Sequence, residues 1–193
     1  MSRGLGDVYK RQIYNRAGSA FALATADDFN WDEIFDGATW FHFSGITPAI
    51  SDEMTNICIT ACQKAKEKGM TVSCDLNYRS KLWSSEKACE AMSRICQYVD
   101  VCIANEEDAA DVFGITSKGT DVTTGTVNRE GYKDVAKQLA DRFGFEKVAI
   151  TLRESISAND NNWSAMLYDG KDYYFSKKYK ICLLYTSPSP RDT

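Results

Sequence analysis

Hydrophobic residues along this chain follow two alternating patterns. Short apolar runs rich in β-branched and aromatic residues, typical of buried strands, lie at 39–43, 71–76, 99–104 and 147–152. Longer segments with apolar residues at helical spacing lie between them, at 52–68, 85–98, 106–113 and 132–143. Alternation about every 30 residues predicts right-handed strand–helix–strand units and therefore a parallel sheet.

Capping and turn residues indicate where several of these elements begin and end. Ser51 is a candidate N-cap for the first long helix, and Gly69 is a candidate stop at its other end. Near the end of the chain, Asp169-Gly170 separates two strand-like runs at 163–168 and 171–175. An Asp-Gly pair between such runs predicts a β-hairpin.

Polar residues follow all four predicted parallel strands. They are Ser44-Gly45-Ile46, Asp75-Leu76-Asn77-Tyr78-Arg79, Asn105-Glu106-Glu107-Asp108 and Thr151-Leu152-Arg153. In open α/β sheets, ligands bind in the crevice beyond the carboxyl ends of the strands. Polar motifs gathered at that single edge therefore predict a binding site there.

The residue types in these motifs suit an anionic, hydroxylated ligand. Arg79 can hold a carboxylate or phosphate with two N–H groups, and Asn77 offers both a donor and an acceptor. The acids at 106–108 open a helix, where they complement the helix dipole; they also suit a hydrated Mg²⁺ near a phosphate. Tyr14 and Arg16 pair an aromatic ring with a cation, which fits a sugar acid or an ordinary surface strand.

Composition narrows the classes of function. The 23 basic and 27 acidic residues give a net charge of −4, which argues against a general binder of nucleic acid or of anionic membranes. No apolar run approaches the roughly 20 residues of a membrane span. We expect Trp40, His42 and Phe43 to belong to the core. The cysteines without a C-x-x-C pair are expected to be buried free thiols of a reducing cytosol, namely Cys58, Cys62, Cys74, Cys89, Cys96 and Cys102.

The sequences at the two ends of the chain are related to each other at the level of their possible coding DNA. One back-translation of residues 2–12 has a reverse complement that encodes CLLYTSPSPR, the sequence found at 182–191. The pair resembles a translated adapter from sequencing-library preparation. We therefore expect non-native tails at 1–12 and 182–193 and a native, partial domain at 13–181.

The four motifs occur together and in order, and this set resembles the ribokinase-like (PfkB) carbohydrate kinases. The resemblance lies in Tyr14 to Ala20, Phe43 to Ala49, Asp75 to Arg79 followed by Leu82-Trp83, and Ala104 to Gly114. Within the family the likeness is closest to 2-keto-3-deoxygluconate kinases, and it covers nearly all of 13–181. It implies a ribokinase-like three-layer α/β fold with a mostly parallel, doubly wound sheet that is incomplete at both ends.

The resemblance also implies roles for particular residues and the use of ATP and Mg²⁺. The residues expected to contact the sugar acid are Tyr14, Arg16, Gly45, Ile46, Asn77 and Arg79. Asn105 and Asp108 match the family's N-x-x-E motif, which assists Mg²⁺ and phosphate, with Asp108 where Glu is usual. Thr151 and Arg153 lie where the family's nucleotide-binding segment begins.

The family's G-[AG]-G-D motif, which supplies the catalytic base, does not occur in the sequence. We therefore expect an inactive internal fragment of a cytoplasmic kinase whose partners are a sugar acid, ATP and, in the parent, further copies of itself. Two alternatives stay open. One is a kinase of the same family for another sugar, such as fructose or ribose, and the other is a non-catalytic sugar-binding α/β module.

Overall fold

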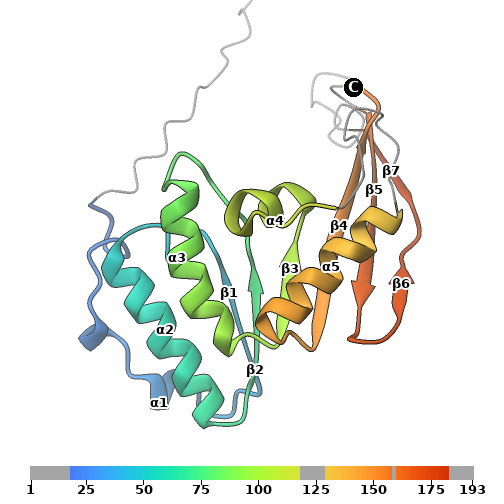
Figure 1. The fold of residues 1–193 in the computed structure, drawn as a ribbon. Helices are drawn as coiled ribbons and strands as arrows, with labels where there is room; N and C mark the ends of the chain where they lie inside the picture. The colour runs from blue at the N-terminus through green and yellow to red at the C-terminus, as the bar shows by residue number, and fades with distance from the viewer. Residues whose placement is uncertain (1–17, 118–128, 158–159, 183–193) are drawn as a thin grey trace, which may run out of the picture.

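The computed structural model describes residues 18–117, 129–157 and 160–182, and these residues form a seven-stranded sheet covered by helices (Figure 1). The strands run in the order β1-β2-β3-β4-β5-β6, and β7 pairs with β5. Their bounds are β1 (Trp40–Ser44), β2 (Thr71–Asp75), β3 (Val101–Ala104), β4 (Lys147–Ser155), β5 (Asp160–Tyr168), β6 (Tyr173–Phe175) and β7 (Tyr179–Cys182). β1 to β4 are parallel, whereas β5 is antiparallel to β4, β6 and β7. The mixed α/β fold with four parallel strands is confirmed.

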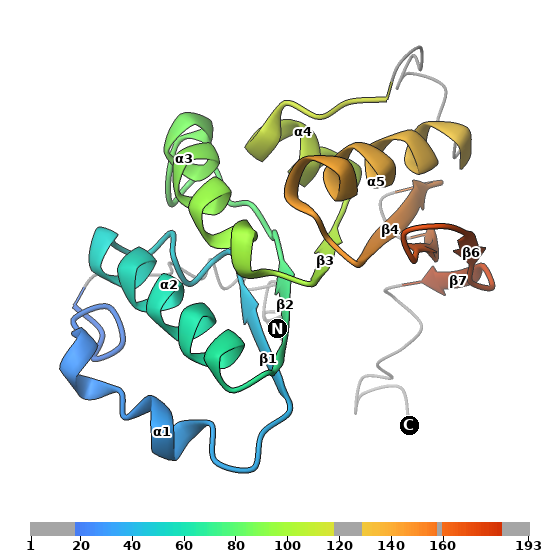
Figure 2. The same cartoon turned by 60° about the horizontal axis from the view of Figure 1, so that its bottom comes forward.

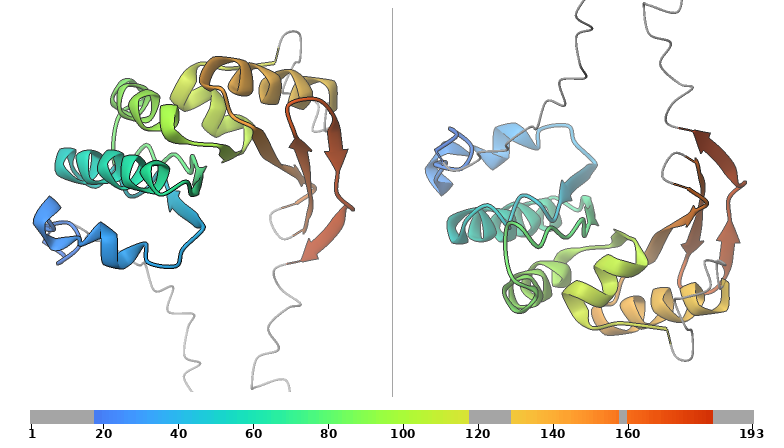
Figure 3. Two further views of the ribbon diagram at one scale, coloured as in Figure 1. Left: turned by 90° about the horizontal axis from the view of Figure 1, so that it is seen from below. Right: turned by 90° about the horizontal axis from the view of Figure 1, so that it is seen from above.

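The helices gather on one face of the sheet. They are η1 (Ala26–Asp28), α1 (Trp31–Ile34), α2 (Asp52–Glu67), α3 (Ser85–Ile95), η2 (Cys96–Tyr98), α4 (Glu106–Phe113) and α5 (Arg129–Phe143). Figures 2 and 3 show α2 to α5 side by side over the same face. Right-handed crossovers that always advance in the same direction along the sheet place their helices in this way. The described residues thus supply the sheet and one helical layer.

The predicted ends of α2 match the structure closely, because they depend on local chemistry. The Ser51 hydroxyl accepts a hydrogen bond from the Met54 backbone N–H at 3.1 Å. At the other end, Gly69 adopts the left-handed conformation, with φ of 70°. An N-cap side chain and a C-terminal glycine satisfy backbone groups that the helix leaves unpaired at its two ends. α4 also has the predicted bounds, and Asn105 is its N-cap.

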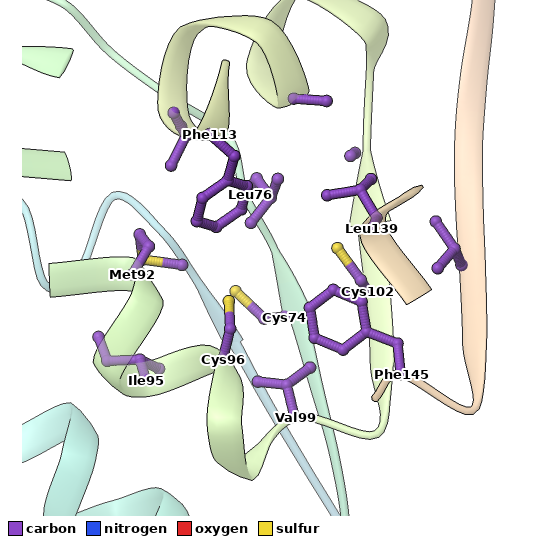
Figure 4. Close-up of a cluster of buried hydrophobic side chains, with 14 of the residues drawn as sticks. Cys74, Leu76, Met92, Ile95, Cys96, Val99, Cys102, Phe113, Leu139 and Phe145 are labelled. Atoms are coloured by element: carbon purple, nitrogen blue, oxygen red, sulfur yellow. The ribbon is translucent and has the colours of Figure 1, made fainter. Parts of the chain in front are cut away.

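The core lies between this helical layer and the sheet. Inward-facing residues of the central strands, such as Val72 and Ile150, are fully buried against apolar residues of the helices. Figure 4 shows part of this cluster, in which Cys74 and Cys96 lie together beneath Met92. Cys89 is half-buried, and the other five cysteines predicted to be buried are so; all six are free thiols. The expected burial is therefore confirmed for five of the six cysteines.

The prediction that Trp40 and His42 belong to the core is wrong. Successive side chains of a strand point to opposite faces of its sheet, and in β1 it is Phe41 and Phe43 that face the helices. Trp40 is 55% exposed, and His42 is exposed as well. Both side chains instead form hydrogen bonds with the Ser73 hydroxyl on β2, at 2.7 and 2.8 Å.

Two further differences between the predicted and observed elements concern the strands that follow β3 in the chain. β4 continues three residues beyond its expected end at Leu152, because it pairs along its length with β5. The expected hairpin around Asp169-Gly170 is present between β5 and β6. β7 was not predicted; it pairs Asp160 with Cys182, the first residue of the segment assigned to the second tail.

Candidate functional site

The carboxyl ends of β1, β2 and β3 bring three of the predicted motifs together. The Gly45 backbone N–H donates a hydrogen bond to the Asp75 carbonyl at 2.7 Å, which joins the segment after β1 to that after β2. The Leu76 N–H donates to the Ile103 carbonyl at 2.9 Å and joins the segment after β2 to β3. These bonds extend the parallel ladder beyond the strands. The segments are therefore fixed to each other by the sheet itself.

Gly45 occupies a position where the two segments approach closely. A Cβ atom built on Gly45 would lie 2.0 Å from the Leu76 carbonyl oxygen and 2.9 Å from its carbonyl carbon. No side chain fits at such distances unless the backbone moves. The neighbouring Ile46 directs its N–H toward the Ser44 hydroxyl at 3.4 Å. The sequence predicted backbone contacts from this segment, and the structure adds a steric reason for the glycine.

Asn77 has the only positive φ among the described residues other than glycine, at 39°. Its side-chain amide donates a hydrogen bond to the Ser44 hydroxyl at 3.1 Å. Asn is among the few residues that tolerate a left-handed backbone, and residues held in this way cluster at functional sites. Ser44 belongs to the predicted motif after β1, but it was not among the residues expected to contact the sugar acid. Its place at the end of β1, on the face opposite Phe43, was the available signal.

Arg79 follows two residues later and is exposed at the edge of the sheet. One of its guanidinium nitrogens, Nη1, donates to the Tyr78 carbonyl at 2.7 Å. The Tyr78 hydroxyl in turn donates to the Trp83 carbonyl at 3.2 Å. Among the described residues the other N–H groups of Arg79 have no hydrogen-bond partner. They are available to an anion at this edge.

Asn105 and Asp108 form the start of α4. The Asn105 side-chain oxygen accepts from the Asp108 N–H at 2.6 Å. The Asp108 carboxylate is buried, with 6% of the residue exposed, and its Oδ1 accepts from the Tyr78 N–H at 3.0 Å. Burial raises the pKa of Asp108, while the hydrogen bond from Tyr78 opposes that rise. Asp108 thus connects α4 to the segment that carries Arg79.

Asp75 lies close to this pair and completes the charge pattern. Burial raises the pKa of Asp75, and His42, the Asn77 backbone N–H and Arg79 oppose the rise. The negative charge of Asp75 also raises the pKa of Asp108, and the positive charge of Arg79 lowers it. Arg79 is therefore a cation whose charge lowers the pKa of both acids.

The arrangement does not fit Asp108 as a direct ligand of Mg²⁺. Its carboxylate is buried and already accepts a hydrogen bond from the Tyr78 backbone N–H. In addition, no group of three or more His, Cys, Asp or Glu side chains placed to hold a metal occurs within the described residues. A Mg²⁺ ion at this edge would need ligands from substrate phosphates and water.

Thr151 and Arg153 are not joined to this cluster in the part of the chain that the structure describes. Thr151 and Arg153 are exposed on β4, where Arg153 Nε donates to the Asn161 side-chain oxygen at 3.0 Å. The Arg153 guanidinium lies 5.7 Å from the centre of the Trp163 ring. Both contacts are to β5. Tyr14 and Arg16 lie outside the described residues.

A mostly parallel sheet with a cationic, backbone-rich edge at its carboxyl end is typical of α/β domains that bind a ligand beyond the ends of their strands. The chain belongs to the pfkB family of carbohydrate kinases, whose model matches residues 6–154. The family predicted from the four motifs is therefore confirmed.

Three similar proteins can be compared with this chain individually. The crystal structure of 2-dehydro-3-deoxygluconokinase from Thermotoga maritima has 48% sequence identity and a TM-score of 0.81, and the match covers 88% of this chain and 50% of that one. A pfkB family carbohydrate kinase from Listeria grayi has 30% identity and a TM-score of 0.75, covering 88% and 49%. The 2-dehydro-3-deoxygalactonokinase of Haloferax volcanii is 37% identical over 142 residues, which are 74% of this chain and 40% of the relative. The chain thus spans about half the length of the relatives it matches.

No helix in the described ranges is both long enough and apolar enough to cross a membrane.

Proposed function

We propose that the whole protein is an ATP-dependent kinase for a six-carbon keto-deoxy sugar acid, namely 2-keto-3-deoxygluconate. The observation that carries this proposal is Arg79, which lies at the carboxyl edge of the sheet and has a hydrogen-bond partner among the described residues for only one of its guanidinium nitrogens. A fixed guanidinium is suited to a planar carboxylate. The names of two similar proteins, which act on 2-dehydro-3-deoxy sugar acids, support the same substrate class.

The chain's own residues would bind and orient the acid. Arg79 would hold the carboxylate together with Tyr14 and Arg16. Asn77 and the backbone at Gly45 and Ile46 would contact the hydroxyl groups. Such positioning matters because phosphoryl transfer depends on aligning the attacking hydroxyl with the phosphate.

ATP and Mg²⁺ belong to the proposal as well. Thr151 and Arg153 are proposed to contact the nucleotide, and Asn105 lies at a helix start that suits a phosphate group. Mg²⁺, when bound, would neutralise charge on the transferring phosphate. A cytoplasmic location is supported by six free cysteines, because reducing compartments keep thiols unpaired.

The test measures steady-state kinetics of the whole protein with Arg79 replaced. Arg79→Ala should raise KM for the keto acid by about 10- to 100-fold, since it removes hydrogen bonds to a charged group. Arg79→Lys keeps the positive charge but loses the planar guanidinium. The KM of this variant should therefore lie between the KM of the unaltered protein and that of Arg79→Ala. Arg94→Ala, an exposed arginine on α3, is the matched control and should leave KM unchanged.

The same assay distinguishes the alternatives. An unchanged KM in Arg79→Ala would reject the proposed carboxylate contact. A higher kcat/KM for fructose or ribose than for the keto acid would assign the protein to another sugar. Binding of the acid without any ATP-dependent turnover would favour a non-catalytic sugar-binding module.

A further inference from the structure

We propose that Asp108 is a positioning residue that holds the segment Asn77–Arg79 in the conformation that presents Arg79 to its ligand. This proposal rests on the proposed function for the identity of that ligand. It differs from the metal- or phosphate-associated role that the family motif implies for this position. The contacts of three consecutive residues carry it.

The first step concerns the backbone after Asn77. Its left-handed conformation, with φ of 39°, is unfavourable for a residue with a side chain and needs support from its surroundings. The peptide group that follows contains the Tyr78 N–H, which donates to Asp108 Oδ1 at 3.0 Å. Because Asp108 is buried, water does not readily replace its carboxylate as the acceptor. The hydrogen bond therefore selects one orientation of this peptide group.

The second step leads from Tyr78 to Arg79. The N–H of Tyr78 is bonded to Asp108, and its carbonyl accepts from Arg79 Nη1 at 2.7 Å. One residue thus connects the buried carboxylate to the exposed guanidinium. A change in the orientation of Tyr78 would move the anchor of the Arg79 side chain.

The third step is that the segment is held from two sides. On the β1 side, the Asn77 amide donates to the Ser44 hydroxyl at 3.1 Å. On the α4 side, the Asp108 carboxylate accepts from the Tyr78 N–H. Within the part of the chain that the structure describes, the other charged group that accepts from a backbone N–H of this segment is Asp75, which interacts with the Asn77 N–H. Asp108 is in turn fixed by the N-cap of α4, because its own N–H donates to the Asn105 side chain. Asp108, which follows β3, therefore influences ligand binding by holding the segment after β2 that contains Arg79.

The proposal predicts that Asp108 contributes an acceptor of defined shape, and that its negative charge is secondary. Asp108→Asn keeps an oxygen acceptor of the same length, whereas Asp108→Ala removes it. Asp111→Ala is the matched control, because it removes an exposed carboxylate from the same helix. The first measurement is amide hydrogen exchange of this chain, resolved at Tyr78 and compared with amides in the middle of α2.

In Asp108→Ala, exchange at the Tyr78 amide should become at least about 10-fold faster relative to α2, because the buried acceptor of its hydrogen bond is lost. Asp108→Asn should restore most of the protection, and Asp111→Ala should match the unaltered chain. Unchanged Tyr78 exchange in Asp108→Ala would overturn the proposal.

The second measurement is the kinetics of the whole protein. Asp108→Ala should raise KM for the keto acid about 10-fold, with rescue by Asp108→Asn and no shift in the Mg²⁺ concentration needed for half-maximal activity. An Asn variant that is as impaired as the Ala variant, or that shifts the Mg²⁺ dependence, would overturn the positioning role in favour of a metal-associated one. If the unaltered protein does not act on the keto acid, the proposed function fails, and the exchange data still decide whether Asp108 holds the segment.

Discussion

At the scale of single residues, the site depends on two backbone constraints that only particular side chains meet. Gly45 lies so close to the Leu76 carbonyl that no Cβ fits, and Asn77 holds a left-handed backbone. Both residues were expected to contact the sugar acid. The structure shows that each also has a local role, because each allows the segments after β1 and β2 to approach one another.

The steric constraint gives a prediction for Gly45→Ala. Its Cβ would overlap the Leu76 carbonyl oxygen, so the substitution should lower the free energy of unfolding by about 3 kcal/mol or more. Gly69→Ala is the control, because its positive φ is unfavourable for alanine but no atom lies within 4 Å; it should cost about 1 kcal/mol. Denaturant unfolding of both variants checks the difference. Equal losses would show that the segments separate easily.

Residue types were easier to predict than residue contacts. The pattern of strand ends located Asn77, Arg79 and Asn105 at one edge, because parallel strands share that edge. It did not reveal the hydrogen bond between Asp108 and Tyr78, since these residues lie 30 positions apart. It also placed Trp40 and His42 inside, because a short apolar run does not show which of its two faces meets the helices.

At the scale of elements, the helices were predicted well because their signals are local. The apolar stripe and capping residues of α2 and α4 determine their bounds without reference to the rest of the fold. The longer β4 and the additional β7 depend on pairing with β5, and cross-strand pairing leaves little trace in the sequence of one strand. Elements fixed by tertiary contact were therefore the ones that the sequence did not specify.

The N-cap of α2 provides a test at this scale. Ser51→Ala removes the acceptor for the Met54 N–H and should lower the free energy of unfolding by about 1 kcal/mol. Ser51→Asn keeps an acceptor at this position and should lose much less. Thermal unfolding of the two variants checks the prediction. An equal loss in Ser51→Asn would mean that the cap does not account for the effect.

At the scale of the whole molecule, the sheet is covered unequally. The described helices lie over one face of the sheet (Figure 3), and that face carries the buried side chains of Phe43 and Ile150. The opposite face leaves large side chains exposed, with Trp40 at 55%, Tyr174 at 53% and Tyr179 at 59%. The stability of the described fold therefore depends mainly on one side of the sheet, the side that holds the five buried thiols of the described residues.

Those thiols give a prediction for the molecule as a whole. Burial raises the pKa of Cys58 and of Cys96 to about 12, and it raises the pKa of Cys74 and Cys102 well above the usual value. Because the thiolate is the reactive form, folded protein at pH 8 should be alkylated at the half-buried Cys89 long before these four. Mass-spectrometric mapping of iodoacetamide adducts, with and without denaturant, measures the order.

The same burial fixes the sign of the pH dependence. A thiol whose pKa is higher in the folded than in the unfolded state stabilises the fold below the unfolded pKa, and this contribution is lost as the pH rises toward the folded value. The free energy of unfolding should therefore decrease between about pH 8.5, the usual thiol pKa, and pH 10, as the unfolded chain ionises first. Cys102→Ala removes one such thiol and should reduce the slope of that decrease. Alkylation of Cys102 at the rate of Cys89 in the native protein would contradict both expectations, because it would show that the core opens freely to solvent.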